Sequence, residues 1–392
     1  MPRNNVFSKV ERYYRDYGAR AKELKGQGIK VIAYLCSLTP IEIITAAGFL
    51  PLRIRGDTRE PITKGDTKLE TIACPFLRSC FDVSLKGRYD FCDGLIIPHA
   101  CDSITRTYSV WRYSTGITYS HFVNLPHKVS EPSVKFFKAE LTTFKNSLER
   151  FADKEISDEA LAEAIDLHAE NRKKVKGLYE LRKSNPPPIS GAEIGKILAV
   201  GMSLHVSESN ELFDAVLREV RRRKEIPLKR RPRIMILGSC LDNVDLVTFI
   251  EDAGADVVVD SLCMGTRDYW RDIGSMGDPM RAIALQYLDK INCPRTYREK
   301  VGKNFKEDAE VRFGDIDWLI KEFKVEGVIL YIYRNCDPFG FEVPARREYL
   351  SSLHIPVLYL EGEYSSGAIG QLKTRIGAFL EMIGQEELEW LT

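Results

Sequence analysis

The sequence GLIIPHACDS at residues 94–103 joins an uninterrupted apolar run to a cysteine and then to residues that favour the start of a helix. A short apolar run of this kind is typical of a strand that is buried on both faces of a parallel sheet. Cys101 closely follows the run, where the carboxyl end of the strand is expected. Because α/β proteins bind their ligands at that edge of the sheet, the stretch predicts an α/β fold with a functional thiol there.

Six of the nine cysteines share this context, at the end of an apolar run or just before a helix-start signal. Cysteine thiolates gathered at the carboxyl edges of parallel strands are placed to hold a metal cluster. The six predicted ligands are Cys36 after KVIAYL, Cys74 before PFLRS, Cys101 after GLIIPHA, Cys263 after DVVVDSL, Cys293 before PRTYR and Cys336 after GVILYIYRN.

No two cysteines have the C-x-x-C spacing, so a zinc ribbon, a thioredoxin motif and a ferredoxin-type run are poorly supported. Ligands that are far apart in sequence would have to converge in space, and soft thiolates in a cleft between domains favour an iron–sulfur cluster over zinc. The other three cysteines, Cys80, Cys92 and Cys240, are predicted to be packing residues. Cys240 is the best reserve ligand because it follows a strand-like run.

Two α/β blocks are predicted on either side of a helical one. Short β-branched runs alternate with helix-length stretches in residues 1–130 and again in residues 229–392, as in two Rossmann-like parallel-sheet domains. Residues 131–228 are rich in Glu, Lys, Leu and Ala at helical spacing, so a helical segment is expected between the domains.

Each α/β block is expected to supply three thiolates to one four-iron cubane, whose fourth iron stays open to a substrate or a bridging ligand. The first block contributes Cys36, Cys74 and Cys101, and the second contributes Cys263, Cys293 and Cys336.

The composition excludes several classes of protein. A net charge of +1 over 392 residues lacks the excess of positive charge that is typical of nucleic-acid-binding proteins. The first residues, MPRNNVFSKVERYYRDYGAR, lack the apolar core of a signal peptide, and no apolar stretch is long enough to span a membrane. The protein is therefore expected in the cytoplasm, where an odd number of cysteines points to metal binding rather than to disulfides.

Several motifs together resemble the superfamily of 2-hydroxyacyl-CoA dehydratases and benzoyl-CoA reductases. They are KVIAYLCSLTPIEIITAAG at 30–48, ACPFLRSCFDVSLKGRYDFCDGLIIPHACDS at 73–103, DSLCMGTRDYW at 260–270, INCPRTYR at 291–298, RNCDPFGFEVP at 334–344 and GQLKTRIGAFLEM at 370–382. The resemblance spans nearly the whole chain. It implies two Rossmann-like domains plus a helical one, and a cluster between the domains with Cys74, Cys101 and Cys336 as ligands.

Cys36, Cys263 and Cys293 exceed this three-ligand pattern. Six thiolates are what two cubanes that share a bridging sulfide require, and the pattern is similar to the double-cubane-cluster proteins of the superfamily. That resemblance implies an [8Fe-9S] cluster in each subunit of a homodimer. The motifs DSLCMGTRDYW and NCDPFGFEVP look closer to the dehydratase-type sequences.

The resemblance also implies a separate ATP-hydrolysing iron–sulfur activator protein that docks and injects single electrons at very low potential. The sequence has no G-x-x-x-x-G-K-[ST] of its own, which is consistent with an external ATPase. The preferred hypothesis is an iron–sulfur reductase that passes these electrons to a small molecule. The alternatives are a [4Fe-4S] subunit of a heterodimeric acyl-CoA dehydratase or reductase, and a non-catalytic electron-relay protein with a closed cluster.

A few polar residues are candidates for supporting roles. His99, two residues before Cys101, is the tentative catalytic residue, as a proton or hydrogen-bond donor to a cluster sulfide. Arg267, Arg334 and Arg375 would suit an acyl-CoA phosphate or carboxylate, but ordinary surface pairing is the preferred interpretation of each.

Overall fold

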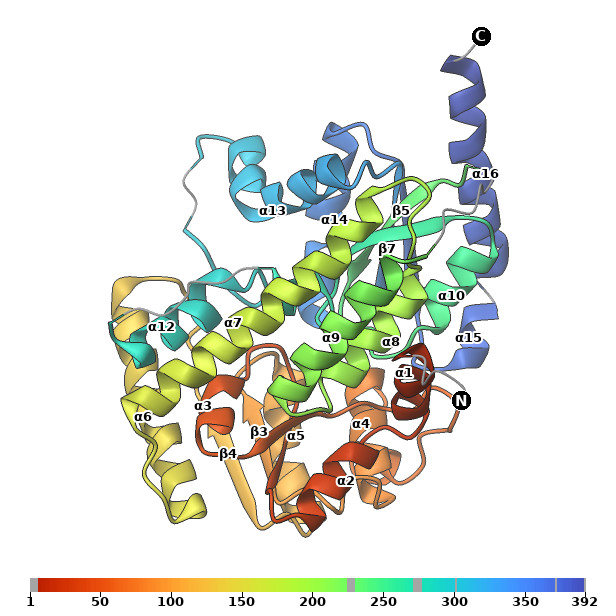
Figure 1. The fold of residues 1–392 in the computed structure, drawn as a ribbon. Helices are drawn as coiled ribbons and strands as arrows, with labels where there is room; N and C mark the ends of the chain where they lie inside the picture. Colours follow the sequence, from red (N-terminus) through yellow and green to blue (C-terminus); the bar gives the residue numbers. More distant parts are fainter. Residues whose placement is uncertain (1–5, 224–229, 271–276, 300–301, 371, 391–392) are drawn as a thin grey trace.

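Two four-stranded parallel sheets form the centre of the structure, a computed structural model that describes residues 6–223, 230–270, 277–299, 302–370 and 372–390 (Figure 1). The strand order of the first sheet is β2-β1-β3-β4, and that of the second is β6-β5-β7-β8. The predicted α/β fold with two Rossmann-like domains is confirmed. The strands are β1 (Val31–Tyr34), β2 (Leu50–Arg53), β3 (Gly94–Pro98), β4 (Tyr119–Val123), β5 (Arg233–Gly238), β6 (Asp256–Ser261), β7 (Gly327–Tyr333) and β8 (Val357–Gly362).

Burial explains which runs of sequence become strands. Every residue of β1, β3, β5 and β7, the inner strands of the two sheets, is buried, as their continuous apolar sequences require. The edge strands β4 and β8 are only partly buried. Strand β2 was not predicted from the sequence, because Pro51 interrupts its apolar pattern. That proline is tolerated since β2 pairs with β1 alone and lies at the edge of the sheet.

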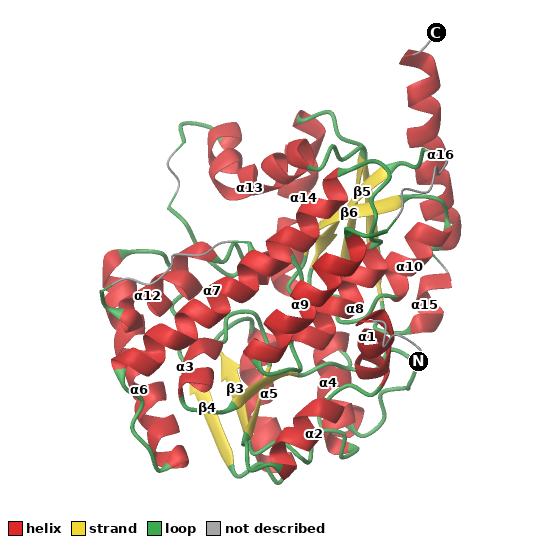
Figure 2. Cartoon of the chain, viewed as in Figure 1, coloured by secondary structure: helices red, strands yellow, loops and turns green. Residues whose placement is uncertain are grey.

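The carboxyl edges of the two sheets face each other. Ser37, after β1, donates its hydroxyl to the carbonyl oxygen of Cys263, after β6, at 2.6 Å. The side-chain amide of Asn335, after β7, lies 3.4 Å from the carbonyl oxygen of Thr71. The loops that carry the predicted cysteine ligands therefore meet in the seam between the two sheets. Figure 2 shows the two groups of strands as separate layers flanked by helices.

Four helices separate the two sheets in the sequence. Serine side chains cap the first three: Ser130, Ser157 and Ser190 each accept a backbone N–H in the first turn. The second of these helices packs on a helix of the first domain and reaches toward the second sheet (Figure 1). The expected boundary at 228–229 lies outside the described residues. The four helices are α6 (Glu131–Ala152), α7 (Asp158–Glu180), α8 (Gly191–Gly201) and α9 (Val206–Val220).

One segment from the second half of the sequence packs against the first domain. Helix α12 (Pro279–Leu285) lies beside α6 (Figure 1), and its apolar side chains share a core with residues of β1 and β3. The guanidinium of Arg295 donates to the carbonyl oxygens of Leu125 and Pro126 at 2.9 and 2.7 Å. Cys293 is therefore held against the first domain, although its position in the sequence had suggested the second.

The remaining helices cover the outer faces of the sheets. No helix within the described residues is long and apolar enough to cross a membrane. They are α1 (Val6–Arg15), α2 (Ala19–Gly26), α3 (Ile41–Ala46), α4 (Pro75–Leu85), α5 (Asp102–Ser114), α10 (Asp245–Asp252), α11 (Thr266–Tyr269), α13 (Phe305–Glu322), α14 (Asp337–Ser352), α15 (Ser366–Gly370) and α16 (Lys373–Trp390).

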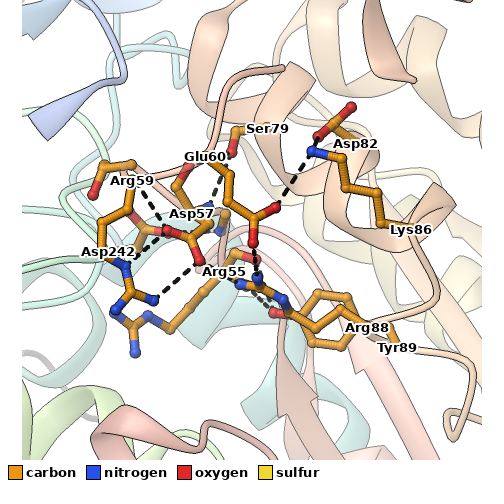
Figure 3. A network of polar contacts seen from close by, with 12 residues as sticks. Arg55, Asp57, Arg59, Glu60, Ser79, Asp82, Lys86, Arg88, Tyr89 and Asp242 are labelled. Carbon is orange, nitrogen blue, oxygen red and sulfur yellow. Dashed lines mark hydrogen bonds and ion pairs between the residues drawn. The ribbon is translucent and has the colours of Figure 1, made fainter. Parts of the chain in front are cut away.

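A polar network fixes the loop that follows β2 (Figure 3). The carboxylate of Asp57 accepts hydrogen bonds from Arg59 at 3.1 Å and from Arg88 at 2.9 Å. The backbone N–H of Asp57 donates to the hydroxyl oxygen of Ser79. The neighbouring backbone N–H of Gly56 donates to the Asp242 carboxylate of the second domain at 2.9 Å. The network therefore ties the first domain to the second.

Replacing Asp57 with asparagine is expected to weaken this tie in a pH-dependent way. Burial raises the pKa of Asp57, but hydrogen bonds from Arg59 and Arg88 outweigh it and lower the pKa to about 2. Because the folded pKa lies below the unfolded value of about 3.9, the stabilisation is complete above about pH 4 and is lost toward pH 2. We expect Asp57→Asn to lower the free energy of unfolding by about 1 kcal/mol at pH 7 and by less at pH 3.

Urea unfolding at the two pH values measures the effect, with Asp16→Asn, at an exposed carboxyl, as the matched control. An equal loss of stability at pH 7 and pH 3 would contradict this account of Asp57.

Candidate metal-cluster site

Partial exposure separates the six predicted ligands from the other cysteines. Each of the six is half-buried, whereas Cys80, Cys92 and Cys240 are buried in the hydrophobic core. Five of the six lie at strand ends or helix starts along the facing sheet edges, and the sixth lies after α12. The half-buried thiols are those of Cys36, Cys74, Cys101, Cys263, Cys293 and Cys336.

Electrostatic contacts divide these thiols into two groups of three. Burial raises the pKa of the Cys36 thiol, Arg53 lowers it, and the thiols of Cys293 and Cys263 raise it further. Cys263 likewise adds to the effect of burial in raising the pKa of Cys293. We call Cys36, Cys263 and Cys293 the first trio.

The second trio consists of Cys74, Cys101 and Cys336. Burial raises the pKa of the Cys336 thiol, and the thiols of Cys74 and Cys101 raise it further. Burial likewise raises the pKa of Cys101 to about 12, with a contribution from Cys74. Two contacts link the trios, because Cys293 also acts on Cys101 and Cys263 also acts on Cys336.

This grouping differs from the expected one, in which each sequence block supplied one set of three. Each trio instead combines thiols from both blocks. The cause is geometric. The two carboxyl edges face each other, so the thiols that influence one another lie across the seam rather than along one sheet.

Burial is the largest cause that raises the pKa of five of these thiols, and neighbouring thiols raise it further for Cys36, Cys101, Cys293 and Cys336. Only the thiolate binds metal, so ionising six neighbouring groups requires compensating positive charge at the same place. Metal ions supply that charge directly. The donor set is therefore suited to a centre with several iron ions.

Arg267 is the cation closest to the first trio. Its side chain is 8% exposed, and its Nη1 donates to the sulfur of Cys263 at 3.1 Å. The expectation that Arg267 forms a surface ion pair is wrong, because α11 turns its side chain inward, four residues after Cys263. By contrast, Arg334 does pair at the surface, with Glu363 at 2.9 Å, and the exposed Arg375 donates to the carbonyl oxygen of Tyr359.

Two further buried arginines face the first trio, and neither was predicted from the sequence. The charge of Arg53 acts on Cys36, and that of Arg295 acts on Cys293. The Nε atoms of both are buried without a hydrogen-bond partner. Orphaned cationic donors beside thiols fit an anionic group between them, which thiolates and cluster sulfides would provide. Nothing in the motif INCPRTYR marks Arg295 as a buried residue, and Arg53 lies in the strand that was not predicted.

The cysteines of the second trio lie at helix N-termini. Cys74, Cys101 and Cys336 are the N-cap residues of α4, α5 and α14. None of the three sulfurs accepts a capping hydrogen bond, but the nearby backbone N–H groups lower the pKa of each thiol against the larger effect of burial. The open N–H groups at a helix start are a natural place for negative charge.

The backbone is strained at two of these positions. Cys36 has φ 67°, and Asn335, next to Cys336, has φ 61°. Non-glycine residues in this left-handed region are uncommon and cost about 1–3 kcal/mol. Strain of this kind persists where the surrounding structure holds a side chain in a functional orientation.

His99 lies beside another histidine. Its Nδ1 is 3.2 Å from Oδ1 of Asn124, and its Nε2 is 3.4 Å from Nε2 of His127. His127 in turn contacts the carbonyl oxygen of Arg295 through Nδ1 at 3.2 Å. In the part of the chain that the structure describes, the ring nitrogens of His99 therefore meet Asn124 and His127 rather than a thiol, and its role as a donor to the cluster stays a prediction.

A small cavity of about 60 Å³ has a mixed polar and apolar lining. Its lining includes Ser37, next to Cys36, and Asp268, next to Arg267. The hydroxyl of Thr39, also in the lining, is buried without a hydrogen-bond partner. A cavity of this size has room for roughly four water molecules or one small molecule.

A single metal ion does not fit this arrangement. Within residues 6–390, apart from the undescribed positions, no group of three or more His, Cys, Asp or Glu side chains is placed to hold one ion. In a cubane each cysteine binds a different iron, so the thiols of a cluster need not converge on one point.

The comparisons with known proteins cover almost the entire chain. The family model described as "2-hydroxyglutaryl-CoA dehydratase, D-component" matches residues 36–383. A benzoyl-CoA reductase subunit of Thauera aromatica is 28% identical over 392 residues, which is 98% of this chain and 99% of the relative. The (R)-phenyllactyl-CoA dehydratase beta subunit of Clostridium sporogenes is 24% identical over 364 residues, covering 92% and 94%.

The exposure pattern predicts how the thiols react. In reduced, cluster-free protein, we expect a small alkylating reagent to modify the six half-buried cysteines well before Cys80, Cys92 and Cys240, because the latter are sealed in the core. Peptide mass spectrometry after limited alkylation identifies the modified residues, and the same reaction in urea, where all nine should react, is the control. Early modification of Cys80 or Cys92 would contradict the placement of the site.

Proposed function

Because the chain belongs to the 2-hydroxyglutaryl-CoA dehydratase D-component family, we propose that it is an iron–sulfur reductase whose six half-buried cysteines hold a double-cubane [8Fe-9S] cluster. The observation that carries the proposal is the division of these cysteines into two linked trios. Three thiolates on each side match two cubanes. The influence of Cys293 on the pKa of Cys101, and of Cys263 on the pKa of Cys336, supports a bridge shared by the two cubanes.

When bound, such a cluster would supply electrons at very low potential. The electrons would arrive singly from a separate ATP-hydrolysing activator protein. This chain's own residues have three tasks: the cysteines hold the irons, the buried arginines and helix N-termini offset the negative charge, and the sheets exclude water from the seam.

The surroundings of the site support a small substrate and a protein partner. The cavity next to Ser37 would admit a molecule of only a few atoms. Ile72 and Phe341, near Cys74 and Cys336 in the sequence, are 78% and 85% exposed. We assign these two apolar side chains to contact with the activator or with a second copy of the chain.

A second candidate is a subunit of an acyl-CoA dehydratase or reductase with one [4Fe-4S] cluster on the second trio. The names of the relatives favour it, since both the benzoyl-CoA reductase and the phenyllactyl-CoA dehydratase relatives are called subunits. In that case the first trio would hold no iron, and a related partner chain would be required.

The Cys263→Ser variant separates the two candidates. Cys263 belongs to the first trio, so its loss should remove irons and change the visible absorption spectrum of anaerobically purified protein if both trios hold a cubane. In the alternative, both the spectrum and the iron content should survive. Cys92→Ser is the matched control, because Cys92 is buried in the core, away from the trios.

About eight irons per chain in the unaltered protein, reduced in Cys263→Ser and kept in Cys92→Ser, is the expected result. Four irons per chain in the unaltered protein, unchanged in Cys263→Ser, would replace the double-cubane proposal with the single-cluster alternative.

A further inference from the structure

The two trios sit in different electrostatic surroundings. Fixed positive charge faces the first: Arg267 touches the sulfur of Cys263 and Arg295 acts on Cys293, while Arg53, which acts on Cys36, is paired with Asp268 at 3.6 Å. All three guanidinium groups are buried, so little solvent screens them. A charge in such surroundings acts more strongly than one at the surface.

Arg267 is held rigidly in place. Its Nη2 donates to the carbonyl oxygen of Ser261 at 2.9 Å, and its Nε donates to the carbonyl oxygen of Asn292 at 3.1 Å. Its guanidinium carbon also lies 4.8 Å from the centre of the Phe339 ring. These contacts anchor the cation to the strand end that carries Cys263 and to the residue before Cys293. Arg267 is therefore held next to two proposed ligands of the same trio.

The second trio has no comparable set of buried cations among the described residues. Its cysteines are the N-cap residues of α4, α5 and α14. The charge nearest in sequence to Cys336 is the acidic Asp337, which also raises the pKa of Cys74. The cation that acts on Cys74, Arg78, is already paired with Asp66 at 2.5 Å. One carboxylate and one paired cation thus stand beside the second trio, whereas the first trio has three buried guanidinium groups, of which that of Arg53 is paired with Asp268.

We propose that Arg267 makes the two halves of the cluster electrically unequal, so that the first electron added to it resides on the half bound by Cys36, Cys263 and Cys293. The inference rests on the proposed double-cubane function and adds to it a positioning residue and a direction.

The physical reason is charge balance. One electron from a chemical reductant such as Ti(III) citrate turns one ferric iron into ferrous iron and Ti(III) into Ti(IV), without making or breaking a bond. The added negative charge is stabilised most where fixed positive charge is nearest, and hydrogen bonds to ligand sulfurs act in the same direction. Arg267 provides both effects at Cys263.

The test uses anaerobically purified, iron-loaded protein and three variants. In Arg267→Gln the charge is lost, while in Arg267→Lys it is kept. Arg346→Gln is the matched control, because Arg346 is also buried and lies 5.4 Å from the same Phe339 ring, but pairs with Glu342 rather than with a thiol. Each protein is titrated with Ti(III) citrate, its potentials are recorded, and its irons are counted and followed by Mössbauer spectroscopy.

We expect the first electron to change only half of the irons in the unaltered protein. Arg267→Gln should shift the first midpoint potential downward with little change in the second, Arg267→Lys should restore most of the shift, and Arg346→Gln should leave both unchanged.

Eight irons per chain that all change equally with the first electron would overturn the inference while leaving the double cubane intact, and so would equal shifts of both potentials in Arg267→Gln. The Mössbauer result on the unaltered protein decides the question even if Arg267→Gln does not load iron. Four irons per chain would overturn the double-cubane function and this inference together.

Discussion

The burial of cysteine thiols along one seam is the constraint on which the site depends. The two sheets bring their carboxyl edges together, and burial there, with a contribution from neighbouring thiols, makes five of the six thiols harder to ionise. Ionisation of these thiols therefore requires positive charge nearby. Three buried arginines and three helix N-termini lie beside them. Buried cations with unpartnered donors would be costly in a protein that left the seam without anionic groups. The surrounding charge thus supports the same conclusion as the thiols.

The architecture serves this seam in several ways. The loop after β2 is tied across the seam by Gly56 and Asp242. The segment after α12 crosses back to the first domain and delivers Cys293 beside Cys36. As a result, neither trio belongs to one domain, and movement of the domains relative to each other would disrupt both. Membership of the 2-hydroxyglutaryl-CoA dehydratase D-component family is consistent with this use of paired sheets around one central site.

Most of the fold and the membership of the site could be predicted from sequence, because buried parallel strands are continuous apolar runs and the cysteines follow them. The edge strand β2 was missed because Pro51 breaks that pattern. Arg267 was misjudged because a four-residue helix decides which way its side chain points. The grouping of the thiols into two trios depends on how the two sheets face each other, and no local sequence pattern encodes that arrangement. For the same reason, Cys293 could not be placed against the first domain.

The central claim is that both trios hold iron, and anomalous diffraction at the iron absorption edge from anaerobically grown crystals tests it most directly. The account predicts two adjoining groups of iron, one against Cys36, Cys263 and Cys293 and the other against Cys74, Cys101 and Cys336. A single group of iron confined to Cys74, Cys101 and Cys336, with free thiols at the other three cysteines, would contradict it.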